Sequence, residues 1–116
     1  MTLGIDIGGT TTKIIGLKTG TVSEGLTVKA DDALASAAGA LGKFLAEQNM
    51  RLSDVRQVAV TGVGAGRVGQ KLFESDVRQV SEFEAIGRGG SFLGKVSQAV
   101  VVSVGTGTAL VHVDGD

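Results

Sequence analysis

Apolar and polar positions alternate through much of the first 30 residues, which is typical of β-strands. The apolar, mostly β-branched residues fall into three stretches separated by Gly- and Thr-rich turns, namely residues 3–6, 13–17 and 22–29. The spacing then becomes helical, with apolar side chains three or four residues apart from Leu34 to Leu45 and with Asp31 or Asp32 available as a cap. We therefore expect a three-strand meander followed by a helix that ends near residue 48.

The second half of the chain predicts strands that alternate with helices. Strands are expected at residues 56–61 and 77–80, a short helix at 66–73, and a longer helix at 82–95. Ser81 and Glu84 match a capping box, in which Ser81 accepts from the N–H of Glu84 and the Glu84 side chain reaches back to Ser81. The order βββαβαβ predicts a mixed five-stranded sheet with right-handed crossovers and helices on both faces.

One Gly/Thr turn occurs twice, each time between two apolar strands. Residues 6–13 read Asp-Ile-Gly-Gly-Thr-Thr-Thr-Lys, and residues 103–109 read Ser-Val-Gly-Thr-Gly-Thr-Ala. Glycine allows close backbone approach and positive φ, and threonine adds hydroxyl groups, so each turn can hold phosphate oxygens and the two can clamp a polyphosphate. The predicted phosphate-binding residues are Asp6, Ile7, Gly8, Gly9, Thr10, Thr11, Thr12, Lys13, Gly105, Thr106, Gly107 and Thr108.

Phosphoryl transfer requires positioned phosphates, a bridging metal and an oriented nucleophile. Asp6 ends the first strand where the turn begins, so its carboxylate can hold Mg²⁺ directly or through water; the alternative is an Asx-type turn cap. Lys13 can neutralise phosphate charge or be an ordinary solvated strand lysine. Glu82 occupies the first position of the predicted helix, where an acidic residue is common for dipole reasons alone, and Arg88 is expected to be a solvated charge.

Composition limits the classes of function. The 116 residues are 42% hydrophobic and 20% charged, which suits about one globular domain. A net charge of −1 and an aromatic content of 3% predict neither nucleic acid nor a membrane as a partner. The absence of cysteine and of an apolar run of spanning length favours a cytoplasmic protein, and the one histidine, His112, fits an ordinary strand position.

A competing motif lies between the two turns. Residues 64–69 spell G-x-G-x-x-G between a predicted strand and a predicted helix, with Glu82 or Glu84 about 20 residues further on, as in nicotinamide-dinucleotide folds. The βββα start and the short remaining chain disfavour that interpretation, and a flexible strand-to-helix turn is the alternative. No Walker P-loop is present.

Residues 6–13 resemble the first phosphate motif of the actin, Hsp70 and sugar-kinase (ASKHA) superfamily, and the second Gly/Thr turn resembles its second phosphate motif. Together, residues 81–85 and 104–110 resemble type II pantothenate kinases, over essentially the whole chain. This resemblance implies a ribonuclease H-like actin-like ATPase lobe, ATP and Mg²⁺ as cofactors, pantothenate as substrate, Glu82 as catalytic base, and a homodimer. It further implies ATP binding by Thr106.

The same resemblance predicts the domain organisation. Residues 1–95 would form the first lobe, including the helix at 82–95, and residues 96–116 would begin a second lobe whose remainder lies beyond this sequence. The Asp114-Gly115 turn signal also predicts a longer protein. Two alternatives stay open: an ATPase that activates a dehydratase, a class that binds an iron–sulfur cluster through cysteine, and a non-catalytic dimerisation or regulatory module.

Overall fold

The computed structural model describes residues 1–115, which divide into two compact units. The first unit comprises Met1–Gln79, and the second begins at Val80. Among the described residues, no helix has both the length and the apolar character needed to cross a membrane.

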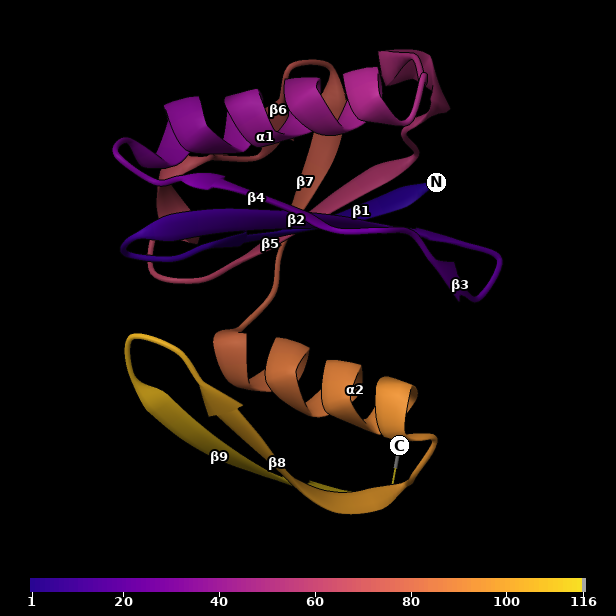
Figure 1. Cartoon of the computed structure of the whole chain (residues 1–116), viewed down its shortest axis with the longest axis vertical. Helices are drawn as coiled ribbons and strands as arrows, with labels where there is room; N and C mark the ends of the chain where they lie inside the picture. The colour runs from indigo at the N-terminus through magenta and orange to yellow at the C-terminus, as the bar shows by residue number, and fades with distance from the viewer. Residues whose placement is uncertain (116) are drawn as a thin grey trace. The chain divides into compact units, whose positions relative to one another are not determined.

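The first unit is built on one mixed sheet of seven strands (Figure 1). Its elements are β1 (Thr2–Ile7), β2 (Thr11–Lys18), β3 (Thr21–Val22), β4 (Leu26–Lys29), α1 (Ala33–Glu47), η1 (Leu52–Asp54), β5 (Gln57–Thr61), η2 (Ala65–Arg67), β6 (Lys71–Leu72) and β7 (Ser75–Gln79). The strand order is β3-β2-β1-β5-β7-β6, and β4 also pairs with β2. The β1–β5 and β5–β7 pairs are parallel and the others antiparallel, so the predicted mixed sheet is confirmed.

The core of this unit lies between α1 and one face of the sheet. Alternate residues of β1 are buried, and they share this face with alternate residues of β2 and β5. The fully buried large side chains are Leu3, Ile5, Ile7, Thr12, Ile14, Leu41, Phe44, Val58 and Val60. Asp32 caps α1 as predicted, because its carboxylate accepts a hydrogen bond of 2.8 Å from the N–H of Ala35.

Two details of the predicted sheet are wrong. The strand expected at 22–29 is split into β3 and β4, and between them the Ser23 hydroxyl accepts a hydrogen bond of 2.8 Å from the N–H of Gly16 in place of a ladder bond. The short helix expected at 66–73 is absent. A single 3₁₀ turn occupies Ala65–Arg67, Gly69 adopts φ +79°, and the chain then forms the β6–β7 hairpin, so the sheet has seven strands instead of five.

The second unit consists of α2 (Glu82–Gly94) packed on a hairpin of β8 (Gln98–Val104) and β9 (Thr108–Asp114). The helix approaches the hairpin closely. A Cβ on Gly90 would lie 2.5 Å from Val101 Cγ1, and one on Gly87 would lie 3.1 Å from Val111 Cγ1. The predicted helix and hairpin are therefore confirmed, with glycines where the two elements meet.

Helix α2 groups with the hairpin in this unit, whereas the sequence assigned it to the first lobe. The lobe boundary of a complete enzyme stays a prediction. Gly115 adopts φ +80° and donates to the Ser97 carbonyl at 2.8 Å, and the final residue of the predicted Asp-Gly turn region, 116, lies outside the described residues.

Candidate functional site

The first Gly/Thr turn joins two strands of the buried sheet. β1 and β2 pair from Thr2 with Leu17 up to Ile7 with Thr12, so the turn is anchored on both sides. The Gly8 N–H donates to the Thr11 carbonyl at 2.9 Å, and a Cβ on Gly8 would lie at that same distance from the Thr11 oxygen. Gly8 therefore has to be glycine for the turn to close this tightly. Gly9 and Thr10, at the tip, are exposed.

The glycines of the two turns do not use positive φ, contrary to the expectation from sequence. The positive-φ glycines among the described residues are Gly20, Gly62, Gly69 and Gly115. Close approach is the property that matters at Gly8, whereas Gly9 and Gly107 have nothing within 4 Å of an added Cβ.

Three polar side chains form a row across the sheet beside this turn. Asp6 pairs with Lys13 on β2 and with Thr61 on β5. The neighbours of Asp6 in β1, Ile5 and Ile7, are buried beneath α1, so the row lies on the opposite face of the sheet. The structure thus brings together the predicted metal ligand, a cation, and a hydroxyl at the carboxyl ends of β1 and β5.

Thr61 is a candidate residue that sequence reasoning missed. Its hydroxyl oxygen is buried without a hydrogen-bond partner among the described residues. An unpaired buried hydroxyl costs about 1–3 kcal/mol, so it is typically retained for a reason. In the sequence, Thr61 appears only as a threonine at the end of an apolar strand. It becomes a candidate site residue once the register of β5 with β1 places it beside Asp6.

Thr12 has a different environment from the other threonines of the first turn. Its side chain is 0% exposed, and its hydroxyl lies 3.0 Å from Ser36 Oγ in α1. The Thr12 hydroxyl therefore joins sheet to helix and does not point toward the turn. Thr10 and Thr11 stay predicted side-chain donors, whereas the Thr12 hydroxyl has a structural role.

The second Gly/Thr turn closes the hairpin of the second unit. Val104 pairs with Thr108, and the Gly105 N–H donates to the Gly107 carbonyl at 2.9 Å, leaving Thr106 exposed at the tip. Figure 1 shows this turn at the same end of the unit as the first turn of α2. The second unit thus places residues 105–108 and the start of the predicted catalytic helix at one end.

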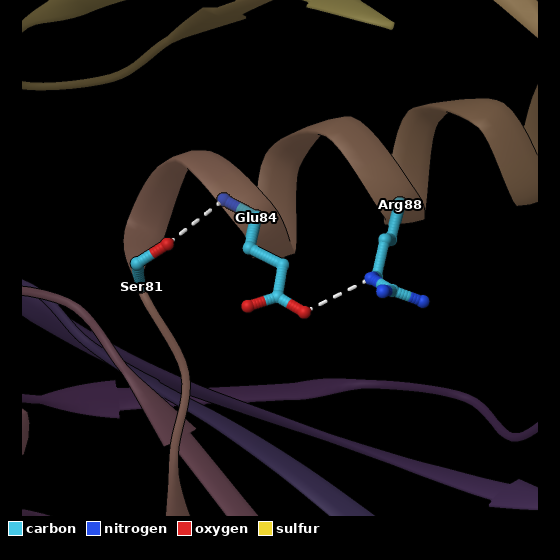
Figure 2. Close-up of polar contacts among 3 residues, drawn as sticks. All are labelled: Ser81, Glu84 and Arg88. Atoms are coloured by element: carbon cyan, nitrogen blue, oxygen red, sulfur yellow. Dashed lines mark hydrogen bonds and ion pairs between the residues drawn. The ribbon is translucent and has the colours of Figure 1, made fainter. Parts of the chain in front are cut away.

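Helix α2 begins with half of the predicted capping box. The Ser81 hydroxyl accepts from the Glu84 N–H at 3.2 Å, as expected. The reciprocal bond is absent from the described residues, because the Glu84 carboxylate instead lies 3.0 Å from Nε of Arg88, one turn further along (Figure 2). Arg88 is largely exposed but paired, so its predicted solvated role holds only in part.

Glu82 is exposed in the first turn of α2. No hydrogen bond or ion pair found within residues 1–115 involves its side chain. Glu82 is therefore available to a ligand, whereas Glu84 is occupied by Arg88.

The G-x-G-x-x-G segment lacks the geometry of a dinucleotide site. Such a site requires a helix whose N-terminus faces the pyrophosphate, and the segment instead contains only the three-residue 3₁₀ turn at Ala65–Arg67. Gly64 packs on Ile7 of β1, while Gly66 and Gly69 have nothing within 4 Å of an added Cβ. The segment supports the end of β1 instead.

The side chains fit Mg²⁺ bound with a nucleotide better than a metal held by the protein alone. The described residues contain no group of three or more His, Cys, Asp or Glu side chains that could hold an ion. Mg²⁺ accompanying a nucleotide needs only one or two carboxylates, with phosphates and water completing its octahedron. Asp6 meets that requirement.

The sheet with a glycine-rich turn between its first two strands defines the class of protein, because these features belong to the actin-like ATPase fold. The (R)-2-hydroxyglutaryl-CoA dehydratase component A of Acidaminococcus fermentans matches with a TM-score of 0.70 and 27% identity, over 92% of this chain and 44% of that one. The activator of the 2-hydroxyisocaproyl-CoA dehydratase from Clostridium difficile, solved with bound ADPNP, matches at 0.70 and 21%, over 96% and 45%. The ROK hexokinase from Thermus thermophilus has the same fold, at 0.72 and 16%, over 98% and 46%.

Residues 3–116 match the BadF/BadG/BcrA/BcrD ATPase family, and the chain belongs to this family. The expected superfamily is confirmed, and the comparisons give no support for type II pantothenate kinase as the particular family. No curated protein is significantly similar to the chain in sequence. The chain spans less than half the length of the three solved structures described above.

Proposed function

We propose that this chain supplies the phosphate-binding turns of an enzyme that binds Mg·ATP and transfers or hydrolyses its terminal phosphate. The observation that carries the proposal is the pairing of Asp6 with Lys13 directly beside the closed turn at Gly8. A carboxylate for the metal, a cation and the exposed turn residues Gly9 and Thr10 thus lie at one end of these strands. Family membership and the ADPNP-bound relative support the same ligand.

Each side chain has a distinct task in this proposal. Asp6 holds Mg²⁺ directly or through water, and the ion neutralises charge on the phosphates when bound. Thr10 and Thr11 donate hydroxyl hydrogen bonds to phosphate oxygens, and Lys13 adds positive charge beside them. Residues 105–108 of the second unit remain a second set of predicted phosphate donors.

The acceptor of the phosphoryl group distinguishes two candidate functions. With water as acceptor the protein is an ATPase, and the two dehydratase-associated relatives favour an activator that couples ATP hydrolysis to its target. Iron–sulfur ligands of such an activator would have to lie outside these 116 residues, which contain no cysteine.

The second candidate is phosphorylation of the primary hydroxyl of pantothenate. It is favoured by Glu82, which is exposed and is the first residue of α2. The first turn of α2 lies at the same end of its unit as the second Gly/Thr turn (Figure 1). A carboxylate there can accept the proton of an attacking hydroxyl. The resemblance that suggests this substrate also suggests a homodimer, which sedimentation equilibrium would detect.

Nucleotide binding and turnover separate these functions. Calorimetric titration of the chain with Mg·ATP tests the phosphate site, and phosphate release measured with and without pantothenate identifies the acceptor. Pantothenate-dependent ADP formation supports the kinase, and pantothenate-independent hydrolysis supports the activator ATPase. A chain that binds no Mg·ATP contradicts the proposal that these turns hold the phosphates of the nucleotide, and it is then a non-catalytic module or a fragment.

The role of Glu82 is tested separately, by substitution in the form of the protein that shows ATP turnover. We expect Glu82→Ala to lower kcat by about 10²-fold or more with little change in ATP affinity, because a general acid or base contributes typically 10²–10⁴-fold. Glu74→Ala is the matched control, since Glu74 is an exposed glutamate in the other unit. Turnover of Glu82→Ala close to that of the wild type would remove Glu82 from the reaction.

A further inference from the structure

The loop that follows β5 packs against the end of β1, immediately before the first Gly/Thr turn. The Gly64 N–H donates to the Ile7 carbonyl at 3.0 Å, and a Cβ on Gly64 would lie 2.5 Å from Ile7 Cγ2. Parallel pairing of Asp6 with Thr61 brings the two chain segments together at this point. The loop formed by residues 62–64 therefore has little freedom relative to Asp6.

Gly62 occupies the position in this loop that lies against the Asp6 side chain. A Cβ on Gly62 would lie 2.6 Å from Oδ1 of Asp6 and 2.5 Å from the Ile7 carbonyl oxygen, closer than real Cβ contacts occur. The residue also adopts φ +93°, a conformation that side chains disfavour. The Asp6 carboxylate thus lies in space that any other residue at position 62 would need.

We infer that Gly62 is a positioning residue for Asp6. Its missing side chain lets the carboxylate lie against the loop at the carboxyl end of β1, in the orientation that holds Mg²⁺ with the nucleotide. This inference rests on the proposed function of Asp6. Gly62 touches neither metal nor phosphate in this arrangement and acts on the site through the carboxylate, while its contact with the Ile7 carbonyl is a separate constraint on the backbone.

Gly69 separates this effect from backbone strain. It lies in the same segment of chain and has a similar positive φ of +79°, but an added Cβ there would have nothing within 4 Å. Gly69→Ala therefore introduces left-handed strain without a contact to Asp6. It is the matched control for Gly62→Ala.

A double-mutant cycle tests the inference. The dissociation constant of Mg·ADP is measured by calorimetry for the wild-type chain, Gly62→Ala, Asp6→Ala, the Asp6→Ala/Gly62→Ala double variant, and Gly69→Ala. The free energy of unfolding is measured in parallel by urea denaturation. We expect Gly62→Ala to weaken Mg·ADP binding about tenfold or more, and Gly69→Ala to leave it within about twofold of the wild type.

The Asp6→Ala background shows whether the effect passes through the carboxylate. We expect the loss of Mg·ADP affinity caused by Gly62→Ala to be several-fold smaller there, because the Asp6 carboxylate is gone and only the contact with the Ile7 carbonyl remains. Equal losses of affinity in the two backgrounds would overturn the inference and leave the proposed function intact. A wild-type chain that binds no Mg·ADP would instead overturn the proposed function.

If Gly62→Ala alone does not fold, the free energy of unfolding of the double variant tests the inference instead. Asp6→Ala removes the contact between an added Cβ at position 62 and Asp6 Oδ1, but it retains the contact with the Ile7 carbonyl oxygen. The retained contact is present in both backgrounds, so its contribution to stability cancels when the two are compared. Recovery of a folded protein in the double variant supports the inference. Because the Ile7 carbonyl contact remains in the double variant, the decisive quantity is the free energy of unfolding, and an equal loss from Gly62→Ala in the wild-type and Asp6→Ala backgrounds contradicts the inference.

Discussion

The two Gly/Thr turns have similar sequences, but the strands that support them differ in burial. The strands around the first turn belong to the seven-stranded sheet, and alternate residues of β1 and β2 are fully buried beneath α1. The strands around the second form an isolated pair in which no residue is fully buried. Similar turns are thus supported by a sheet with a buried core in the first unit and by a two-stranded hairpin in the second.

This difference identifies what each hairpin depends on. The first depends on its own apolar core, since Leu3, Ile5 and Ile7 pack beneath the helix. The second depends on close contact with α2, through Gly87 and Gly90. We therefore expect substitutions at equivalent positions of the two hairpins to have unequal effects on stability.

Truncation of an apolar strand residue should give the largest contrast. Ile5 is 1% exposed and Val102 is 56% exposed. We expect Ile5→Ala to lower the free energy of unfolding of the first unit by about 2–5 kcal/mol, because it leaves a cavity in the core. Val102→Ala should change that of the second unit by less than about 0.5 kcal/mol. Amide hydrogen exchange reports each unit separately, and equal effects would refute the difference in support.

Adding a methyl group to the turn glycines should give a smaller contrast. Gly8→Ala places a Cβ 2.9 Å from the Thr11 oxygen, whereas Gly107→Ala meets nothing within 4 Å. We expect the first change to cost about 1–3 kcal/mol of unfolding free energy, as overpacking typically does, and the second to cost less than about 0.5 kcal/mol. Thermal unfolding followed by NMR would measure both, and a destabilising Gly107→Ala would contradict the comparison.

Replacing a threonine by valine should separate the paired hydroxyl from the unpaired one. Thr12→Val removes the hydrogen bond to Ser36 and should cost about 1 kcal/mol. Thr61→Val removes a buried hydroxyl that has no partner among the described residues, so stability should be unchanged or higher. Urea denaturation of the two variants measures this, and a large loss of stability in Thr61→Val would show that its hydroxyl is already satisfied.

The ion pair on α2 should have the smallest effect. Glu84 and Arg88 lie one helical turn apart in the favourable order, but both are substantially exposed. We expect Arg88→Ala to lower the stability of the second unit by about 0.3–0.5 kcal/mol, and the loss to shrink in high salt. Hydrogen exchange of α2 at low and high ionic strength measures it, and a salt-independent loss would indicate packing of the Arg88 stem instead.

Much of this fold could be predicted because local signals and packing agree. The alternation in residues 3–6 and 13–17, the Asp32 cap, and the helical spacing after Leu34 all correspond to observed elements. The segment after β5 was predicted wrongly because a helical pattern was accepted despite its glycines. Gly69 adopts positive φ there, and the chain turns into β6 and β7.

The site residues that are neighbours in sequence could be predicted, whereas those brought together only by strand pairing could not. Asp6 and the turn that follows it are adjacent in sequence, so their association could be recognised directly. Thr61 and Gly62 reach Asp6 only through parallel pairing of β1 with β5, which no local pattern reveals. The hydroxyl of Thr12 was misjudged because its burial depends on Ser36, in a helix 24 residues away.

The glycines of α2 also have a consequence for how the second unit melts. Residues 89–94 of α2 include three glycines, and each glycine costs about 1 kcal/mol of helix propensity relative to alanine. A two-stranded hairpin with no other packing is only marginally stable in water. Within the described residues, each element is therefore stabilised mainly by its contact with the other. Opening of the hairpin should therefore unwind the helix in the same cooperative event, and a ligand that bridges Glu82 and the β8–β9 turn would order both at once.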